Sequence, residues 1–134
     1  MCIRDSLGAE RPIFVGDRID TDILGANNVG MASLFVFTGA HGKHELIAAH
    51  AGERPTHIGY NVSALLEEPR TVERRDLEWV CNAQRVGVED GHAVLLTTPA
   101  GIQAELDALW VLLQLAWEHG VDVVDAANSL QDVR

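Results

Sequence analysis

The sequence predicts an α/β fold, in which a short parallel sheet with flanking helices is followed by a second region that is α-rich or α+β. Two apolar runs, residues 12–16 and 33–37, are short, uninterrupted and bounded by Gly. Such runs are typical of strands buried on both faces of a parallel sheet. Each is followed by a helical segment, which is the pattern of right-handed crossovers. With 134 residues, 47% of them apolar, the chain is long enough to bury a core without disulfides.

The first half of the chain is predicted to alternate strands and helices. The expected strands are 12–16, 33–37 and a short one at 56–59. The first helix is expected to begin with Asp20 or Thr21 as N-cap and to end at Gly30, which suits a left-handed C-cap. Further helices are expected at 43–51 and 61–67, the last ended by Pro69. In open parallel sheets ligands bind beyond the carboxyl ends of the strands. Segments 17–22 and 38–44 are therefore the predicted functional loops.

The second half is predicted to be a separate region. Residues 70–75, which include Arg70, Arg74 and Arg75, are polar and are expected to form a solvated linker. Segments 76–87 and 92–97 are expected to pair as strands around the turn signal 89–91. Helices are expected at 102–119, ended by Gly120, and at 121–130. The predicted domains are thus 7–69 and 70–134.

Composition excludes several classes of function. The net charge of −10 disfavours nucleic-acid and anionic-membrane partners, which require clustered positive charge. Two cysteines, Cys2 and Cys81, are too few for a disulfide framework. The longest apolar stretch, 109–116, is too short to span a bilayer. The expected location is therefore the cytoplasm.

The first six residues, MCIRDS, form a distinct segment. Their codons can be written to resemble a transposon end that is ligated to DNA fragments for sequencing. We expect residues 1–6 to be adaptor read-through and the native sequence to begin near Leu7, within a longer gene. The alternative is a genuine short N-terminal tail.

Three carboxylates, Asp17, Asp20 and Asp22, follow the first predicted strand within six residues. Mg²⁺ takes one or two protein carboxylates and fills the rest of its shell with water and phosphate. Asp17 is placed at the end of the strand, where it can point into the crevice. Asp22 is placed to orient a neighbouring group. The alternative is that one or two of these residues only cap the helix.

The segment VGDRIDTDILGANNVGMASLFVFTG resembles the fourth motif of the haloacid-dehalogenase (HAD) superfamily. It is most similar to the subgroup with a large C2-type cap, which includes sugar-phosphate and nitrophenyl-phosphate phosphatases. The continuation at 54–66, beginning Arg-Pro-Thr, resembles the terminal strand and helix of that subgroup. The resemblance covers residues 8–69. It implies a partial Rossmann-like core, Asp17 as a Mg²⁺ ligand and Asp22 as its supporting acidic residue. It also places Arg18 near substrate and has Thr38 and Gly39 shape the next loop.

The departures from the family pattern limit what the chain can do alone. HAD phosphatases carry an Asp-x-Asp pair directly after their first strand, followed by Gly-Thr, and its first Asp is the nucleophile. This chain has no such segment, and Asp122-Val-Val-Asp125 has the wrong spacing. Its one lysine, Lys43, is in the wrong place to balance phosphate charge. The resemblance therefore implies no catalytic nucleophile here and no activity for the chain by itself.

Several other residues have a possible functional role, but a structural interpretation is favoured for each. His41, His44 and His50 are interpreted as surface residues rather than as a metal site. Cys81 is expected to be a buried structural thiol rather than a nucleophile. The three tryptophans, Trp79, Trp110 and Trp117, are interpreted as helix core rather than as the lining of a ligand pocket.

Two hypotheses for function remain. The first is a fragment of a Mg²⁺-dependent HAD phosphohydrolase that acts on a small phosphate monoester through an aspartyl-phosphate. The second is a non-catalytic binding or assembly module that uses the apolar 102–119 helix. The sequence specifies neither the substrate, because the cap is missing, nor the oligomeric state. We expect the isolated chain to be marginally stable or prone to aggregation, because an incomplete sheet exposes an edge.

Overall fold

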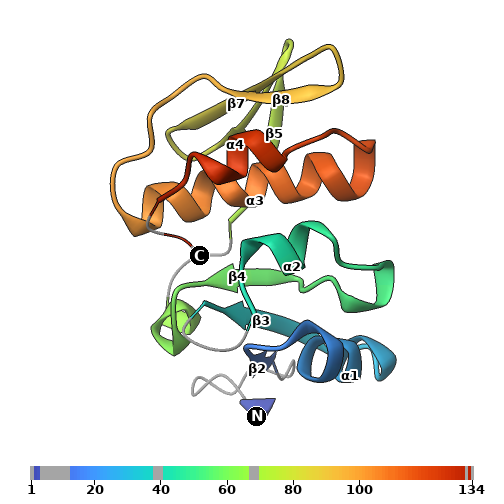
Figure 1. Ribbon diagram of the computed structural model, residues 1–134. Helices are drawn as coiled ribbons and strands as arrows, with labels where there is room; N and C mark the ends of the chain where they lie inside the picture. The colour runs from blue at the N-terminus through green and yellow to red at the C-terminus, as the bar shows by residue number, and fades with distance from the viewer. Residues whose placement is uncertain (1, 4–12, 38–40, 67–69, 132, 134) are drawn as a thin grey trace. The chain divides into compact units, whose positions relative to one another are not determined.

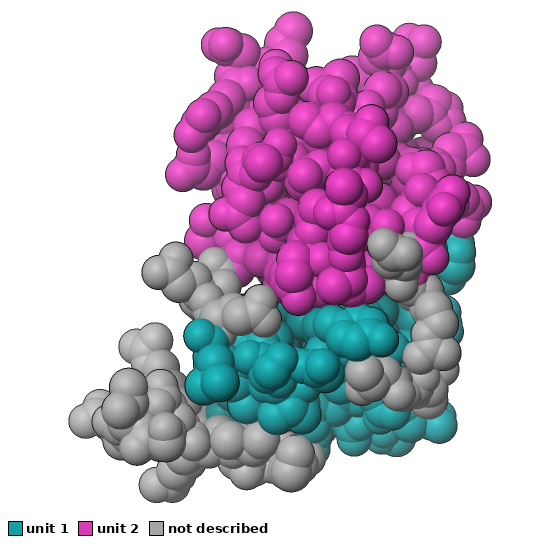
Figure 2. Space-filling view, turned by 90° about the vertical axis from the view of Figure 1, so that its left-hand side faces the viewer, with its two compact units in different colours: residues 1–68 teal, residues 69–134 magenta. Residues whose placement is uncertain are grey.

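The computed structural model describes residues 2–3, 13–37, 41–66, 70–131 and 133 (Figure 1). The chain divides into two compact units, residues 1–68 and residues 69–134 (Figure 2). Several predicted features lie outside the described residues, namely most of the adaptor-like segment 1–6, Leu7, Pro12, the pair Thr38 and Gly39, and Pro69.

The first unit is built on a four-stranded sheet with the order β1-β2-β3-β4. Its strands are β1 (Cys2–Ile3), β2 (Ile13–Gly16), β3 (Ala32–Val36) and β4 (His57–Gly59). β2, β3 and β4 are parallel, while β1 pairs antiparallel with β2. The predicted α/β class and its three parallel strands are therefore confirmed. Because the strands are parallel, the loops after β2 and β3 leave the sheet at the same edge.

Short helical segments lie between these strands and after the last of them (Figure 1). They are η1 (Ile19–Ile23), α1 (Leu24–Asn28), α2 (Lys43–Ile47), η2 (Ala51–Glu53) and η3 (Val62–Leu66). The predicted N-cap at Asp20 or Thr21 is wrong, because η1 is a π-helical turn whose N-cap is Arg18. The predicted helix 43–51 is shorter than expected, because it ends at Ile47 and the backbone is extended at His50. The predicted helix 61–67 is a 3₁₀ turn.

Apolar side chains cover the sheet of the first unit on both faces. Val15, Leu34 and Val36 form a buried cluster, against which Ala64 and Leu65 of η3 pack. Phe35 alternates with these residues along β3 and makes an edge-to-face contact with Phe37, their ring centroids 4.9 Å apart. Successive side chains of a strand point to opposite faces, so β3 contributes to both layers. Burial on both faces explains why the run 33–37 lacks polar alternation apart from Ser33.

Ser33 fixes the approach of the chain to β4. It is fully buried. Its N–H donates to Thr56 Oγ1 at 2.7 Å, and the Thr56 hydroxyl donates to the Ser33 carbonyl at 2.8 Å. The reciprocal bond runs from the Thr56 N–H to Ser33 Oγ at 3.2 Å. These three bonds satisfy the buried polar groups and hold the register of the parallel pair.

The second unit is an antiparallel meander with two helices, which is the α+β form of the prediction. Its strands, in the order β5-β6-β7-β8, are β5 (Glu73–Arg75), β6 (Glu78–Cys81), β7 (Gln84–Glu89) and β8 (His92–Leu95). The helices are α3 (Ile102–His119) and α4 (Val124–Asn128). α3 packs against β6 and β7, and it ends at Gly120 as predicted, where the backbone is left-handed. The predicted helix 121–130 is shorter at both ends.

Tight turns join the four strands. Asp90 and Gly91, which join β7 to β8, both have positive φ, as a type I′ hairpin requires. The turn predicted at 89–91 is therefore confirmed. Asp76 and Asn82 also have positive φ and begin the other two turns. Asn and Asp tolerate this conformation better than most residues. The segment 76–87, predicted as one strand, therefore contains β6, a turn and most of β7.

The prediction of a solvated linker at 70–75 is wrong. Residues 73–75 pair with β6 as β5. Arg70 forms an ion pair with Asp107 of α3, with 2.8 Å between Nε and Oδ1, and the two side chains are only 10% and 15% exposed. Arg74 lies over the ring of Trp79 at 5.1 Å. Arg70 is thus held by a partner distant in sequence, whereas Arg75 pairs with Glu73 within the exposed strand β5.

Helix α3 buries most of its apolar residues. Leu106, Leu109, Leu112, Leu113 and Leu115 are fully buried. The exposed large apolar side chains of the described residues all lie outside this helix. No helix in the described parts of the chain is both long and apolar enough to cross a membrane.

Candidate functional site

The loop at the carboxyl end of β2 is organised around the Asp22 side chain. Asp22 Oδ2 accepts a hydrogen bond from the Asp17 N–H at 3.2 Å and a longer one from the Arg18 N–H at 3.4 Å. The π-helical turn of η1 brings Asp22 back over the loop, five residues after Asp17. π-Helical turns are rare and are frequently found at functional sites. Asp22 therefore supports the loop that presents the Asp17 carboxylate.

Gly16 is required for this arrangement. A Cβ atom at position 16 would lie 2.3 Å from Asp22 Cβ and 2.5 Å from Asp22 Oδ2. Any side chain there would displace the carboxylate that holds the loop. The Gly-Asp pair at the end of β2 is thus explained by packing against Asp22.

Arg18 and Asp20 form a bidentate ion pair at the surface of the loop. Arg18 Nε donates to Asp20 Oδ1 at 3.2 Å, and a terminal nitrogen donates to Oδ2 at 3.1 Å. This pairing raises the pKa of Arg18 and lowers the pKa of Asp20. The Asp20 carboxylate is therefore engaged by the guanidinium. Binding of a phosphate by Arg18 stays a prediction, and it would compete with Asp20.

His41 contacts this loop from the segment that follows β3. The Nδ1 atom of the His41 ring accepts a hydrogen bond from the Ile19 N–H at 3.1 Å. The backbone N–H of His41 donates to the Asp17 carbonyl at 3.2 Å. His41, interpreted from the sequence as a surface residue, is half-buried, and its ring faces this loop. Its position in the predicted functional loop 38–44 was the signal that could have identified it. His44 and His50 are exposed.

The carboxylates of this loop differ in how they are used. Asp22 faces the backbone and Asp20 faces Arg18, whereas Asp17 directly follows Gly16, the last residue of β2. Mg²⁺ takes one or two carboxylates from a protein, so the donors present fit this ion. Within the residues that the structure describes, no three His, Cys, Asp or Glu side chains come together as a metal cluster. Asp17 and Asp22 as Mg²⁺ residues remain a prediction.

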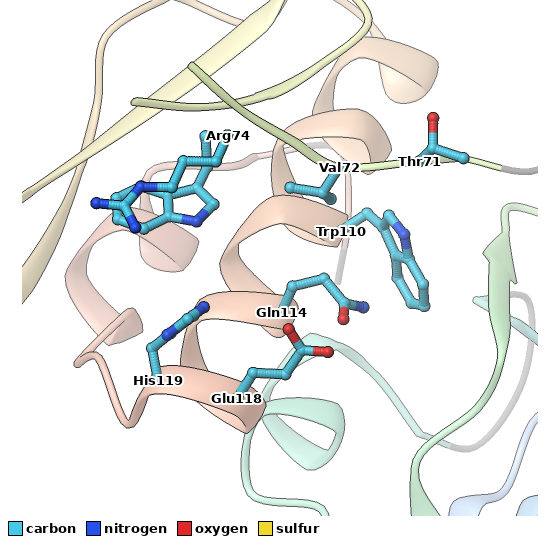
Figure 3. Close-up of a pocket in the computed structure, with 8 residues that line it drawn as sticks. Thr71, Val72, Arg74, Trp110, Gln114, Glu118 and His119 are labelled. Atoms are coloured by element: carbon cyan, nitrogen blue, oxygen red, sulfur yellow. The ribbon is translucent and has the colours of Figure 1, made fainter. Parts of the chain in front are cut away.

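The second unit holds a pocket of about 480 Å³ (Figure 3). Its wall includes Trp79, Trp110 and, along α3, Gln114, Glu118 and His119. The tryptophans were predicted to form helix core rather than a pocket wall. Trp110 is buried on α3 and packs edge-to-face against Trp117, but it also lines this pocket. For Trp79 the prediction is wrong, because this residue lies on β6. Arg74 covers the Trp79 ring and His119 packs beside it. Trp79 therefore contacts two other residues that line this pocket, Arg74 and His119.

Cys81 is buried, as expected. Burial, together with the negative charge of Asp107, raises the pKa of its thiol to about 11. Since the thiolate is the reactive form, this environment makes Cys81 unsuited to nucleophilic attack. Lys43, the one lysine of the chain, is also buried.

A family model described as HAD-hydrolase-like matches residues 2–65. D-glycerol 3-phosphate phosphatase from Mycobacterium tuberculosis (strain ATCC 25618 / H37Rv) is 41% identical over 58 residues, which are 43% of this chain and 16% of that protein. The chain thus spans about one sixth of the curated relative that it matches.

Two solved structures of glycerol phosphate phosphatase from Mycobacterium tuberculosis are similar in fold. The complex with magnesium is 24% identical, with a TM-score of 0.68 over 91% of this chain and 38% of that one. The complex with calcium is 28% identical, with a TM-score of 0.62 over 80% of this chain and 30% of that one. A match over 91% of the chain extends well into residues 69–134. The fold of the second unit, for which the sequence suggested no family, therefore also has a counterpart there.

Proposed function

We propose that this chain is part of a Mg²⁺-dependent phosphohydrolase that acts on a small phosphate monoester, because residues 2–65 match a HAD-hydrolase-like family model. The observation that carries the proposal is the anchoring of the Asp17 loop by Asp22 at the end of β2. The relative that is 41% identical acts on glycerol 3-phosphate, so this is the substrate to assay first.

In this proposal each residue of the loop has a different role in binding the metal or the substrate. Asp17 holds the metal. The Asp22 carboxylate keeps the Asp17 backbone in place by accepting a hydrogen bond from the Asp17 N–H. Bound Mg²⁺ would neutralise charge that develops on the transferring phosphoryl group. Arg18 lies at the surface beside Asp17, where it can exchange Asp20 for an anionic substrate. The nucleophilic Asp belongs to a segment that this chain lacks, so the chain alone is expected to be inactive.

The second hypothesis, assembly through the apolar 102–119 helix, has less support from the structure. Most of the apolar side chains of α3 are buried, so a partner would find few of them exposed.

Mg²⁺ titration of the 134-residue chain, followed by amide chemical shifts in NMR spectra, tests the metal role. We expect saturable shifts at residues 16–22, a large loss of affinity in Asp17→Asn, and wild-type affinity in Asp20→Asn. The last variant is the matched control, because it changes the same residue type in the same loop. Ionic strength is held constant with NaCl, since a net charge of −10 attracts any cation.

Equal affinity of wild type and Asp17→Asn would refute the metal role. The companion measurement is glycerol 3-phosphate hydrolysis by the longer enzyme that contains this sequence. Asp17→Ala is expected to abolish its Mg²⁺-dependent turnover, and unchanged Mg²⁺ dependence would contradict the proposal.

A further inference from the structure

Resting on the proposed function, we propose that His41 is a positioning residue, which sets the backbone of residues 17–19 so that Asp17 can bind the metal. His41 belongs to the segment after β3, and the loop it contacts follows β2. The two segments meet because β2 and β3 are parallel neighbours whose carboxyl ends lie at one edge of the sheet.

The backbone groups of residues 17–19 are all engaged. The carbonyls of Arg18 and Ile19 accept bonds from N–H groups of the helical turn, which are local contacts. The N–H groups of Asp17 and Arg18 donate to Asp22. Two groups remain, the Asp17 carbonyl and the Ile19 N–H, and His41 satisfies both. Asp22 therefore holds this loop from its own helical turn, and His41 holds it from the neighbouring strand's loop.

The two contacts of His41 bracket Arg18. The His41 backbone N–H contacts Asp17, and the His41 ring contacts Ile19, so the loop cannot rotate about Arg18 without breaking one of them. A carboxylate whose backbone is fixed loses less conformational freedom when it binds an ion. The ring contact uses Nδ1 as an acceptor, which places the ring proton of neutral His41 on Nε2.

Substitutions can separate the acceptor from the rest of the side chain. His41→Asn places a carbonyl oxygen where Nδ1 stands, one bond beyond Cγ. His41→Leu puts a methyl group there, and His41→Gln moves the acceptor one bond outward. His44→Leu is the matched control, because His44 is an exposed histidine of the same segment.

Two readouts on the 134-residue chain test the proposal, namely the hydrogen-exchange rate of the Ile19 amide and the Mg²⁺ affinity from NMR titration. We expect His41→Leu and His41→Gln to accelerate Ile19 exchange at least tenfold and to weaken Mg²⁺ binding at least fivefold. We expect His41→Asn and His44→Leu to stay within twofold of wild type in both. Rescue by Asn distinguishes the acceptor from simple packing of the ring.

Each outcome decides between the alternatives. Wild-type Mg²⁺ affinity in both His41→Leu and His41→Gln, or equal loss in His41→Asn and His41→Leu, overturns the positioning role. If His41→Leu fails to fold, the comparison of Gln with Asn remains decisive. If wild type shows no saturable Mg²⁺ shift, the proposed function fails, and with it the metal part of this inference. Ile19 exchange then still decides whether His41 holds the loop.

Discussion

Two acidic sites, one in each unit of this chain, hold their partners in opposite ways. In the first unit Asp20 and Asp22 bind partners within five residues in sequence, at a loop near the surface. In the second unit Asp107 binds Arg70, 37 residues away, and Asn82, 25 residues away, in a largely buried position. The first arrangement shapes a loop for binding, whereas the second joins the start of the unit to α3. Identical residue types therefore acquire different roles from the sequence separation of their partners.

The largest predicted effect is a loss of stability when the Asp107 side chain is removed. Asp107→Ala leaves the guanidinium of Arg70 without its carboxylate at a site with little solvent exposure, which we expect to lower the free energy of unfolding of the second unit by about 3 kcal/mol. Chemical denaturation followed by tryptophan fluorescence measures it, because all three tryptophans lie in residues 69–134.

Glu73→Ala is the control for that change. It removes the ion pair between Arg75 and Glu73, whose side chains are exposed, and should alter the unfolding free energy by less than about 0.5 kcal/mol. Equal effects of the two substitutions would contradict the contrast between buried and exposed pairs.

The next effect is confined to the first unit. Gly16→Ala forces Asp22 away from the loop, and we expect it to destabilise this unit by about 1–3 kcal/mol. Hydrogen exchange of the β2 and β3 amides should accelerate, while the tryptophan transition of the second unit stays in place.

Gly25→Ala is the matched variant, because a Cβ at position 25 of α1 meets no atom within 4 Å. It is expected to be neutral or slightly stabilising, since Ala favours a helix over Gly. A loss of stability in Gly25→Ala as large as in Gly16→Ala would show that the Asp22 contact is not the cause.

The last effect concerns a single buried thiol, that of Cys81. With a pKa of about 11 instead of 9, roughly one thiol in a thousand is ionised at pH 8, against about one in ten in the unfolded chain. In a Cys2→Ser background, alkylation of the native protein should be at least 100-fold slower than alkylation in denaturant. Equal rates would contradict the burial of this thiol.

The raised pKa of Cys81 also makes the stability of the protein depend on pH. The native state holds the Cys81 proton more tightly than the unfolded state does, so the contribution of Cys81 to stability is present below pH 9 and is lost as the pH rises toward 11. Cys81→Ala should remove this part of the alkaline loss of stability. An unchanged alkaline profile would contradict it.

Local patterns explain which features could be predicted. The apolar runs of β2 and β3, the Gly120 end of α3 and the Asp90-Gly91 turn follow from the conformational preferences of neighbouring residues. The Asp17 loop was also identified, because its carboxylates lie close together in sequence. The Arg70–Asp107 pair was missed and its segment was interpreted as a linker, since nothing near Arg70 in the sequence indicates its partner.

The sequence by itself determined the α/β class of the first unit, the positions of its parallel strands and the loop where carboxylates gather. Only the tertiary structure decided that His41 joins this loop and that residues 73–75 form a strand. It also decided that Asp22 turns its carboxylate toward the backbone, where Gly16 leaves room for it. The physical reason is that strand positions depend on local hydrophobicity, whereas these contacts depend on which chain segments the sheet brings together.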